Sequence, residues 1–413
     1  MSDNIQKKNQ KSLLVFLSTA LLIGVFLRLS FPGDIEYNGD QQFLFGAGQE
    51  VGVTRPWPLV GSNSSAGFNN PGLSMWIFVV LTRIAHATNP PELARAVQVM
   101  NILALCMLGF FSLRLVPKAE RLLWCWATAF AAVSSTLVVW NRKISSPSTF
   151  PLFCMGFWIS WHYRQKRAGA FFWGLIGACL GQIHMSGFMF AAGVFLWTVF
   201  HDRRAKWGSW FLGSLVGVIP MIPWLQYMVA QPGHGFNWLI FLSMFYPKYW
   251  IYWVSDALGL GLANSLKTIH YLDMLRYPLI GGTATYLCAI AHVAIIVCVI
   301  LILVSVRKKK GFFLGIRDTS ETGLGINSVM FGAGILMSIT IVNICRHYLL
   351  VTFPLEWVWL SRMGLGDKRV GQRYLLVIWI AQLIISVSFL LYIHINHGDT
   401  QSDYGITYQF QAK

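Results

Sequence analysis

Charged residues are scarce in this sequence, and acidic residues are the scarcest of all. Asp and Glu account for 16 of the 413 residues, against 32 Lys and Arg, and charged residues together make up 12% of the chain. Soluble domains carry about 25% charged residues, so a chain this poor in charge is not expected to cover a water-exposed surface. The composition excludes an ordinary soluble enzyme.

The sequence also lacks the alternation of apolar and polar residues that marks the strands of a transmembrane β-barrel. Its apolar residues, 55% of the chain, instead form continuous runs that are long enough to cross a hydrocarbon core about 30 Å thick. The mean hydropathy is +0.54. These runs predict an all-α polytopic membrane protein.

Cysteine is missing from the long hydrophilic loops, where a disulfide framework would need it. All seven cysteines lie in or at the edge of apolar runs. The sequence has no H-E-x-x-H motif and no close cysteine pair, so a zinc site is disfavoured. We expect no disulfide framework. The sequence identifies no cofactor with certainty, and it leaves a divalent metal ion open without supporting one.

A net charge of +16 raises the question of nucleic-acid binding. The basic residues, however, sit in short clusters between apolar runs, which is typical of cytoplasmic loops, so no nucleic-acid partner is expected. The first cluster predicts a cytoplasmic N-terminus, followed by a first apolar run that reads as a retained anchor because it has no small-residue cleavage site. The clusters are Lys7/Lys8/Lys11, Arg114/Lys118/Arg121, Arg164/Lys166/Arg167, Arg203/Arg204/Lys206, residues 307–310 with Arg317, and Arg362/Lys368/Arg369/Arg373.

The segment 71–87 is apolar, but the basic clusters argue against its crossing the membrane. If it crossed, Arg114 and every later cluster would fall on the wrong side. It is short, opens on a proline and carries Arg83. We therefore expect an interfacial or re-entrant helix on the outer surface.

Eleven spanning helices remain, with the C-terminus outside. The chain would form one integral membrane domain, 1–413, with a first outer loop at 32–92, a second at 227–281 and an outer tail at 395–413. The aromatic stretch 236–253 of the second loop is expected to lie flat at the outer interface. The predicted spans are 12–31, 93–115, 122–140, 148–163, 169–183, 185–201, 207–226, 282–306, 326–345, 347–361 and 374–394.

A quarter of the scarce acids gather just after the first apolar run. Asp34, Glu36, Asp40 and Glu50 lie within 33–50, a stretch without Lys or Arg. Carboxylates can take a proton from an attacking hydroxyl, and arginines can hold a phosphate through two parallel hydrogen bonds. The outer groups able to do chemistry are Asp34, Glu36, Asp40, Arg55, Arg95, Arg142, Lys143, His184, Arg346 and His347.

These groups suit transfer from a membrane-embedded donor that bears a phosphate. A transporter for an anionic solute could line its mouth with the same groups, so both interpretations stay open. Transporters usually place ionisable groups deep within broken spans. Here the predicted spans are nearly free of charge, which favours chemistry at the surface.

Four stretches in order carry a resemblance to a known family. They are "GDQQFLFGA" (39–47), "NNPGLSMW" (69–76), "ELARAVQ" (92–98) and "RHYLLVTFPL" (346–355). In this order the sequence resembles the GT-C superfamily of polyprenyl-phosphate-sugar-dependent glycosyltransferases, such as the protein O-mannosyltransferases and the aminoarabinose transferases of lipid A. The resemblance covers roughly 30–165 well and the rest loosely.

The resemblance implies a GT-C-like fold with outer juxtamembrane helices and an inverting transfer of a sugar. Asp40 would be the catalytic base, and Arg95 and Arg346 would hold the donor phosphate. The sequence departs from the family at Gln41, where the second acid would stand, and at Asn70, where the family has His or Lys before the prolines. These departures put a shared metal in doubt.

The acids of the first outer loop and Arg95 can each be explained either by a role in the site or by a purely structural role. Asp40 follows a turn and could cap a helix, whereas Asp34 and Glu36 could act as a base or contact the acceptor, or simply solvate the loop. Arg95 could anchor a helix by snorkelling beside Glu92. We favour a functional role for Asp40 and Arg95, and expect the two to converge on one outward-opening cavity.

The later candidates are also open to two interpretations. Arg142 and Lys143 could bind the donor phosphate or lipid headgroups, and Arg346 the lipid phosphate. His184 could be a buried turn histidine, and His347 could pack at the interface; a site role is the alternative for both.

The sequence thus predicts a membrane glycosyltransferase that transfers a sugar from a polyprenyl-phosphate donor to a hydroxyl of a lipid, glycan or protein acceptor. The reaction would take place on the non-cytoplasmic face of a bacterial inner (plasma) membrane. The alternative is a transporter or flippase of a lipid-linked or anionic solute. Membrane lipids are expected partners in either case.

Overall fold

The computed structural model describes residues 2–63, 68–230, 247–308, 318, 320–339, 344–366, 370–399, 401–402 and 404–412. These residues form an almost entirely helical fold, as predicted. Three short antiparallel strand pairs complete the regular structure of this part of the chain. They are β1 (Val60–Asn63) with β2 (Asn69–Pro71), β3 (Leu279–Ile280) with β4 (Thr283–Ala284), and β5 (Gly398–Asp399) with β6 (Gly405–Ile406).

Among the described residues, each predicted span coincides largely with helix, because a continuous apolar run can satisfy its own backbone polar groups in a helix. Several are interrupted by a π or 3₁₀ segment: Phe111–Leu115, Ile219–Met221, Ser328–Ala333 and Arg346–Thr352. The helices are α1 (Ser2–Leu29), α2 (Gly39–Glu50), α3 (Leu73–Ala85), α4 (Pro90–Phe110), α5 (Arg121–Val133), α6 (Ser135–Trp140), α7 (Phe150–His162), α8 (Arg167–Ile183), α9 (Ser186–His201), α10 (Trp207–Val218), α11 (Ile222–Val229), α13 (Lys248–Ala257), α14 (Thr268–Met274), α15 (Leu287–Lys308), α16 (Glu321–Asn327), α17 (Gly334–Ile339), α18 (Leu355–Gly364), α19 (Val370–Asn396) and α20 (Tyr408–Gln411).

Several helices are long and apolar enough to suit a membrane protein. Within the described residues there are 6 of them, counting interrupted helices as one. Others, such as α5 and α9, are apolar but shorter. The candidate spans are Lys11–Leu29, Pro90–Leu115, Trp207–Val229, Leu287–Arg307, Glu321–Ile339 and Val370–Asn396.

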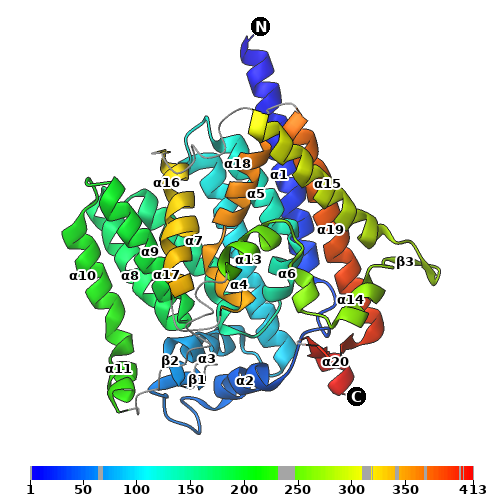
Figure 1. The fold of residues 1–413 in the computed structure, drawn as a ribbon. Helices are drawn as coiled ribbons and strands as arrows, with labels where there is room; N and C mark the ends of the chain where they lie inside the picture. Colours follow the sequence, from blue (N-terminus) through cyan, green and yellow to red (C-terminus); the bar gives the residue numbers. More distant parts are fainter. Residues whose placement is uncertain are drawn as a thin grey trace.

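The helices stand side by side as a bundle, and a smaller layer covers one of its ends (Figure 1). The N-terminal end of α1 projects from the opposite end of the bundle. The covering layer contains α2, α3, β1 and β2, and α20 lies at the same end. The elements between α1 and α4 and the C-terminal helix α20 therefore lie at the same end of the molecule.

Helix α3, from the segment that was predicted not to cross, belongs to this covering layer. Its 13 residues span about 20 Å at 1.5 Å per residue, which is too short for a hydrocarbon core of about 30 Å. Its buried residues Met75, Phe78 and Val79 share a hydrophobic cluster with Leu44 of α2 and Leu93 of α4. This packing fixes α2 against the end of the bundle.

The aromatic stretch 236–253 is partly buried where the structure describes it. Residues 236–246 are outside the described part, and the remainder belongs to α13. Tyr249 and Trp253 are fully buried, and the Tyr249 hydroxyl donates a hydrogen bond to the Val329 carbonyl at 2.9 Å. These side chains are buried because α13 packs against α17 and α18, and the interfacial belt stays a prediction.

Candidate functional site

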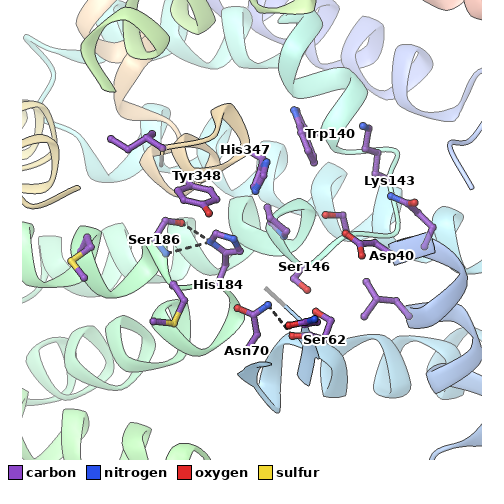
Figure 2. A pocket seen from close by; sticks show the side chains of 18 of the residues that line it. Asp40, Ser62, Asn70, Trp140, Lys143, Ser146, His184, Ser186, His347 and Tyr348 are labelled. Atoms are coloured by element: carbon purple, nitrogen blue, oxygen red, sulfur yellow. Dashed lines mark hydrogen bonds between the residues drawn. The ribbon is translucent and has the colours of Figure 1, made fainter. Parts of the chain in front are cut away.

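A cavity of about 300 Å³ lies beneath the covering layer, where the segment between α1 and α4 meets the ends of the bundle helices (Figure 2). Five of the ten outer groups named from the sequence line it, and so does Asn70, the position of a departure from the family pattern. They come from separate stretches of the chain: Glu36, Asp40, Asn70, Lys143, His184 and His347. The other lining residues are Gln41, Leu44, Ser62, Asn63, Phe68, Trp140, Ser145, Ser146, Pro147, Met185, Ser186, Met189, Met337, Ile344 and Tyr348.

Glu36 and Lys143 form an ion pair at the edge of this cavity. Both side chains are buried, with 8% and 6% of their surface exposed, and the Lys143 ammonium also lies 4.4 Å from the centre of the Trp140 ring. Taking two charges out of water is costly unless each compensates the other. The pair therefore ties the first outer loop to the turn after α6.

Asp40 stands in the first turn of α2 and is exposed. The helix start is stabilised by other residues, since the backbone N–H of Asn38 donates to the Gln41 side-chain oxygen at 3.1 Å. Among the described residues, Asp40 has neither a hydrogen-bond nor an ion-pair partner. Its carboxylate is thus available to a ligand, and Gln41, which departs from the family pattern, has a capping role.

His184 occupies the turn between α8 and α9, and one of its ring nitrogens can be assigned. The backbone N–H of Ser186 donates to Nδ1 at 3.3 Å, and the Ser186 hydroxyl lies 3.0 Å from the same atom. Because Nδ1 accepts a hydrogen bond, the proton of the neutral ring is on Nε2. That N–H is a donor without a partner in the described part of the chain, on a residue that lines the cavity (Figure 2).

Burial and the neighbouring His347 ring both lower the pKa of His184. The two ring centres are 5.5 Å apart, and His347 in turn lies 5.4 Å from Trp140. A positive charge on His184 would lose its hydration inside the protein. The ring is therefore neutral at pH 7.

The lowered pKa of His184 predicts how stability depends on pH. Below about pH 6.5 the unfolded chain takes up a proton at this residue and the folded chain does not, so stability falls as the pH decreases from that point. Replacing the ring by His184→Gln should flatten the decline by roughly 1 kcal/mol between pH 6.5 and 5.5. Thermal unfolding in detergent at both pH values measures this; an equal decline in wild type and variant would contradict it.

Asn70 offers a polar group at the cavity wall. Its amide nitrogen donates to the Ser62 carbonyl at 3.1 Å, while its side-chain oxygen is buried and has no hydrogen-bond partner among the described residues. A buried polar atom without a partner is costly. A hydroxyl group on a ligand could satisfy it.

Arg142 and Arg95 lie at the C-terminal end of α1 and do not line the cavity. Arg142 is buried and donates to the carbonyls of Leu27, Ser30 and Phe31 at 2.7–3.0 Å. The guanidinium of Arg95 lies 3.3 Å from the Leu29 carbonyl. The last carbonyls of a helix lack partners within it, and both cations complement its negative end.

Arg95 lines a different hollow from Asp40, so the expected convergence of these two residues is not found. The second hollow is an open, mostly apolar groove of about 670 Å³ between α3 and α4. Its other lining residues are Pro32, Leu81, Ile84, Ala85, Pro91, Glu92, Ala96, Val99, Met100, Leu103 and Leu152.

Arg346 and Asp34 also have protein partners outside the cavity. Arg346 forms an ion pair with Asp256, donates to the Ser255 hydroxyl at 2.9 Å and does not line the cavity, although the next residue, His347, does. Asp34 is buried and lies 2.8 Å from the ring Nδ1 of His394 on α19. Donor-phosphate binding by Arg346 and a catalytic role for Asp34 stay predictions.

Several other lining residues could not be recognised as site residues from the sequence. Trp140 and Tyr348 are aromatic residues at the ends of apolar runs, which is also the usual position of interfacial anchors. Ser186, two residues after His184, showed no pattern that marked it as a partner of that ring. In the part of the chain that the structure describes, no group of three His, Cys, Asp or Glu residues could hold a metal ion.

Comparisons of this chain with protein-family models, with curated proteins and with solved structures found no match. A function is therefore proposed from the chemistry of the cavity and of the separate groove at Arg95.

Proposed function

We propose that this chain is a membrane glycosyltransferase of GT-C architecture, with eleven spanning helices and the cavity on the non-cytoplasmic side. The donor is a sugar on a polyprenyl phosphate, and the acceptor is a hydroxyl of a lipid, glycan or protein. The sugar and the phosphate enter the cavity. The prenyl chain lies in the apolar groove that contains Arg95.

One observation carries this proposal: Asp40 is a carboxylate without a partner in the described structure, on the wall of a cavity that is otherwise lined by neutral or paired groups. A general base needs such a position, within reach of a ligand hydroxyl. Asp40 takes the proton of the acceptor hydroxyl as its oxygen bonds to the anomeric carbon. The bond from that carbon to the phosphate oxygen breaks, and the configuration inverts.

The leaving phosphate gathers negative charge, which the cavity can offset with two donors. Lys143 has three N–H donors, and Glu36 does not use them all. The Nε2–H of His184 is a second donor, available because Nδ1 is occupied by Ser186. Donors that are positioned before the reaction stabilise developing charge at little reorganisation cost.

Arg95→Gln should raise the KM for the donor by about tenfold and leave kcat nearly unchanged. Arg95 acts on the bound carrier and not on the reacting atoms, so its loss weakens ground-state and transition-state binding alike. Initial rates at varied donor concentration measure both constants. The matched control is Arg83→Gln, which also removes an arginine bonded to a backbone carbonyl, that of Val51 at 2.7 Å, but outside the groove. Equal constants for the two variants would contradict the role of Arg95.

The proposal is tested by incubating the purified protein with radiolabelled polyprenyl-phosphate sugars and an acceptor extract in mixed micelles. The expected result is release of polyprenyl phosphate in step with the appearance of a labelled acceptor. Recovery of intact donor under all conditions would overturn the proposed function.

A transporter or flippase is the second candidate, and interrupted helices favour it. The candidate span Glu321–Ile339 contains the π segment Ser328–Ala333, and Trp207–Val229 is broken at Ile219–Met221. Broken helices often form substrate sites in transporters. Movement of labelled lipid-linked sugar across proteoliposomes without cleavage would favour this candidate.

A further inference from the structure

The C-terminal tail folds back along the loop that carries the cavity acids. Residues 404–411, which we call the strap, run beside residues 33–38, which we call the acidic loop. Figure 1 shows α20 of the strap next to the chain that leads from α1 to α2. The two segments lie near opposite ends of the sequence, and the strap comes shortly after the last long helix, α19, which ends at Asn396.

Backbone hydrogen bonds join the strap to the acidic loop. The N–H groups of Tyr408 and Gln409 donate to the carbonyls of Ile35 and Gly33 at 3.0 and 2.9 Å. Glu36, whose side chain reaches the cavity, forms an antiparallel bridge with Thr407 of the strap. The contact therefore resembles the addition of a short strand to the loop.

Tyr404 is a buried residue at the start of the strap. Only 4% of the residue is exposed, and its hydroxyl donates to the Asp34 carbonyl at 2.6 Å. The centre of its ring lies 5.7 Å from the Lys143 ammonium. Tyr404 thus touches the acidic loop and also the cation that pairs with Glu36.

The close packing leaves no room for the loop to shift toward the strap. A Cβ added at Gly33 would lie 2.9 Å from the Gln409 Cβ, which is nearer than two carbon atoms can approach. The Asn38 amide, just before the start of α2, lies 3.4 Å from the Tyr404 carbonyl. The strap therefore contacts the acidic loop from its first residue to its last.

We propose that the strap positions the acidic loop so that Glu36 meets Lys143 and α2 presents Asp40 to the cavity, with the Tyr404 hydroxyl as the main positioning group. Tyr404 does not touch the reacting atoms. It acts through the loop, and its part in catalysis rests on the proposed function.

The test compares two tyrosine variants of the full chain. Tyr404→Phe removes only the hydroxyl group that donates a hydrogen bond to the Asp34 carbonyl. Tyr286→Phe makes the same chemical change at an exposed tyrosine before α15, away from the strap. Amide hydrogen exchange in residues 33–38 and 404–411, amine labelling of Lys143 and steady-state transfer are then measured for both variants and for wild type.

Tyr404→Phe should raise exchange in both segments on the order of tenfold, because one buried hydrogen bond contributes about that factor to local opening. Lys143 should label faster. The kcat should fall about tenfold with the donor KM unchanged, since the base is displaced but the carrier groove is intact. Tyr286→Phe should match wild type in every measurement.

A second variant, Gly33→Ala, tests the same contact from the loop side. Its methyl group should displace Gln409 and raise exchange in residues 404–411, with the same loss of kcat. Unchanged exchange and labelling in both variants would overturn the proposal, as would raised exchange with an unchanged kcat. A wild-type protein without transfer activity would overturn the proposed function and the catalytic part of this inference, while exchange and labelling would still decide whether the strap holds the loop.

Discussion

Asp40→Asn is expected to lower the rate of sugar transfer by a factor of about 10²–10⁴, the usual contribution of a general base. The amide keeps the size of the side chain but cannot accept the proton of the acceptor hydroxyl. Because Asp40 is exposed and has no partner in the described structure, the substitution leaves no other group unsatisfied. Donor binding and thermal stability should stay close to wild type.

The matched control for Asp40→Asn is Glu50→Gln at the other end of α2. Glu50 is an exposed carboxylate of the same helix, 3.9 Å from Arg55, and does not line the cavity. The Glu50→Gln variant should transfer sugar at the wild-type rate. The initial rate with saturating donor compares the two, and normal transfer by Asp40→Asn would remove Asp40 from the role of base.

Lys143→Met is expected to have the largest effect on stability. It removes the ammonium from a buried pair and leaves the Glu36 carboxylate without its counter-charge. Breaking a buried ion pair from one side costs about 3–5 kcal/mol, and the cavity next to Lys143 should keep the loss near the lower end. Thermal unfolding in detergent, followed by tryptophan fluorescence, measures the change.

The double variant Lys143→Met with Glu36→Gln shows whether the lost stability comes from the single uncompensated charge or from the loss of the two side chains. When both charges are absent, no buried charge is left uncompensated, so most of the lost stability should return. Transfer should stay impaired, because the leaving phosphate has lost a cation. A double variant as unstable as the sum of the two single ones would contradict the importance of the pair.

The helical fold could be predicted from the sequence because each apolar run specifies its own helix. A run such as 374–394 satisfies its backbone internally wherever it lies, so the prediction needs no knowledge of its neighbours. The apolar segment 71–87 likewise contains a helix, α3. The burial of the aromatic residues of α13 could not be predicted. Tyr249 and Trp253 are buried where α13 packs against α17 and α18, and a local sequence pattern does not show which helices will cover a segment.

The candidate site was only partly predictable, and the arginines show why. Residue type and outer position indicated Arg95 and Arg142 as phosphate ligands, but both lie at the end of α1, where free carbonyls attract cations. Lys143, next to Arg142 in sequence, lines the cavity instead. Which of two adjacent cations meets a helix end depends on tertiary geometry, as does the pairing of Glu36 with Lys143.

Photolabelling of the cavity tests the central claim most directly. A polyprenyl-phosphate sugar that carries a diazirine on the sugar ring is bound to the purified protein and irradiated, and the attachment sites are mapped by mass spectrometry. The account predicts adducts at cavity residues such as Trp140, Met185 and Tyr348, suppressed by excess unmodified donor and retained in Asp40→Asn. Adducts confined to other surfaces, such as the exposed faces of α10 and α15, would contradict it.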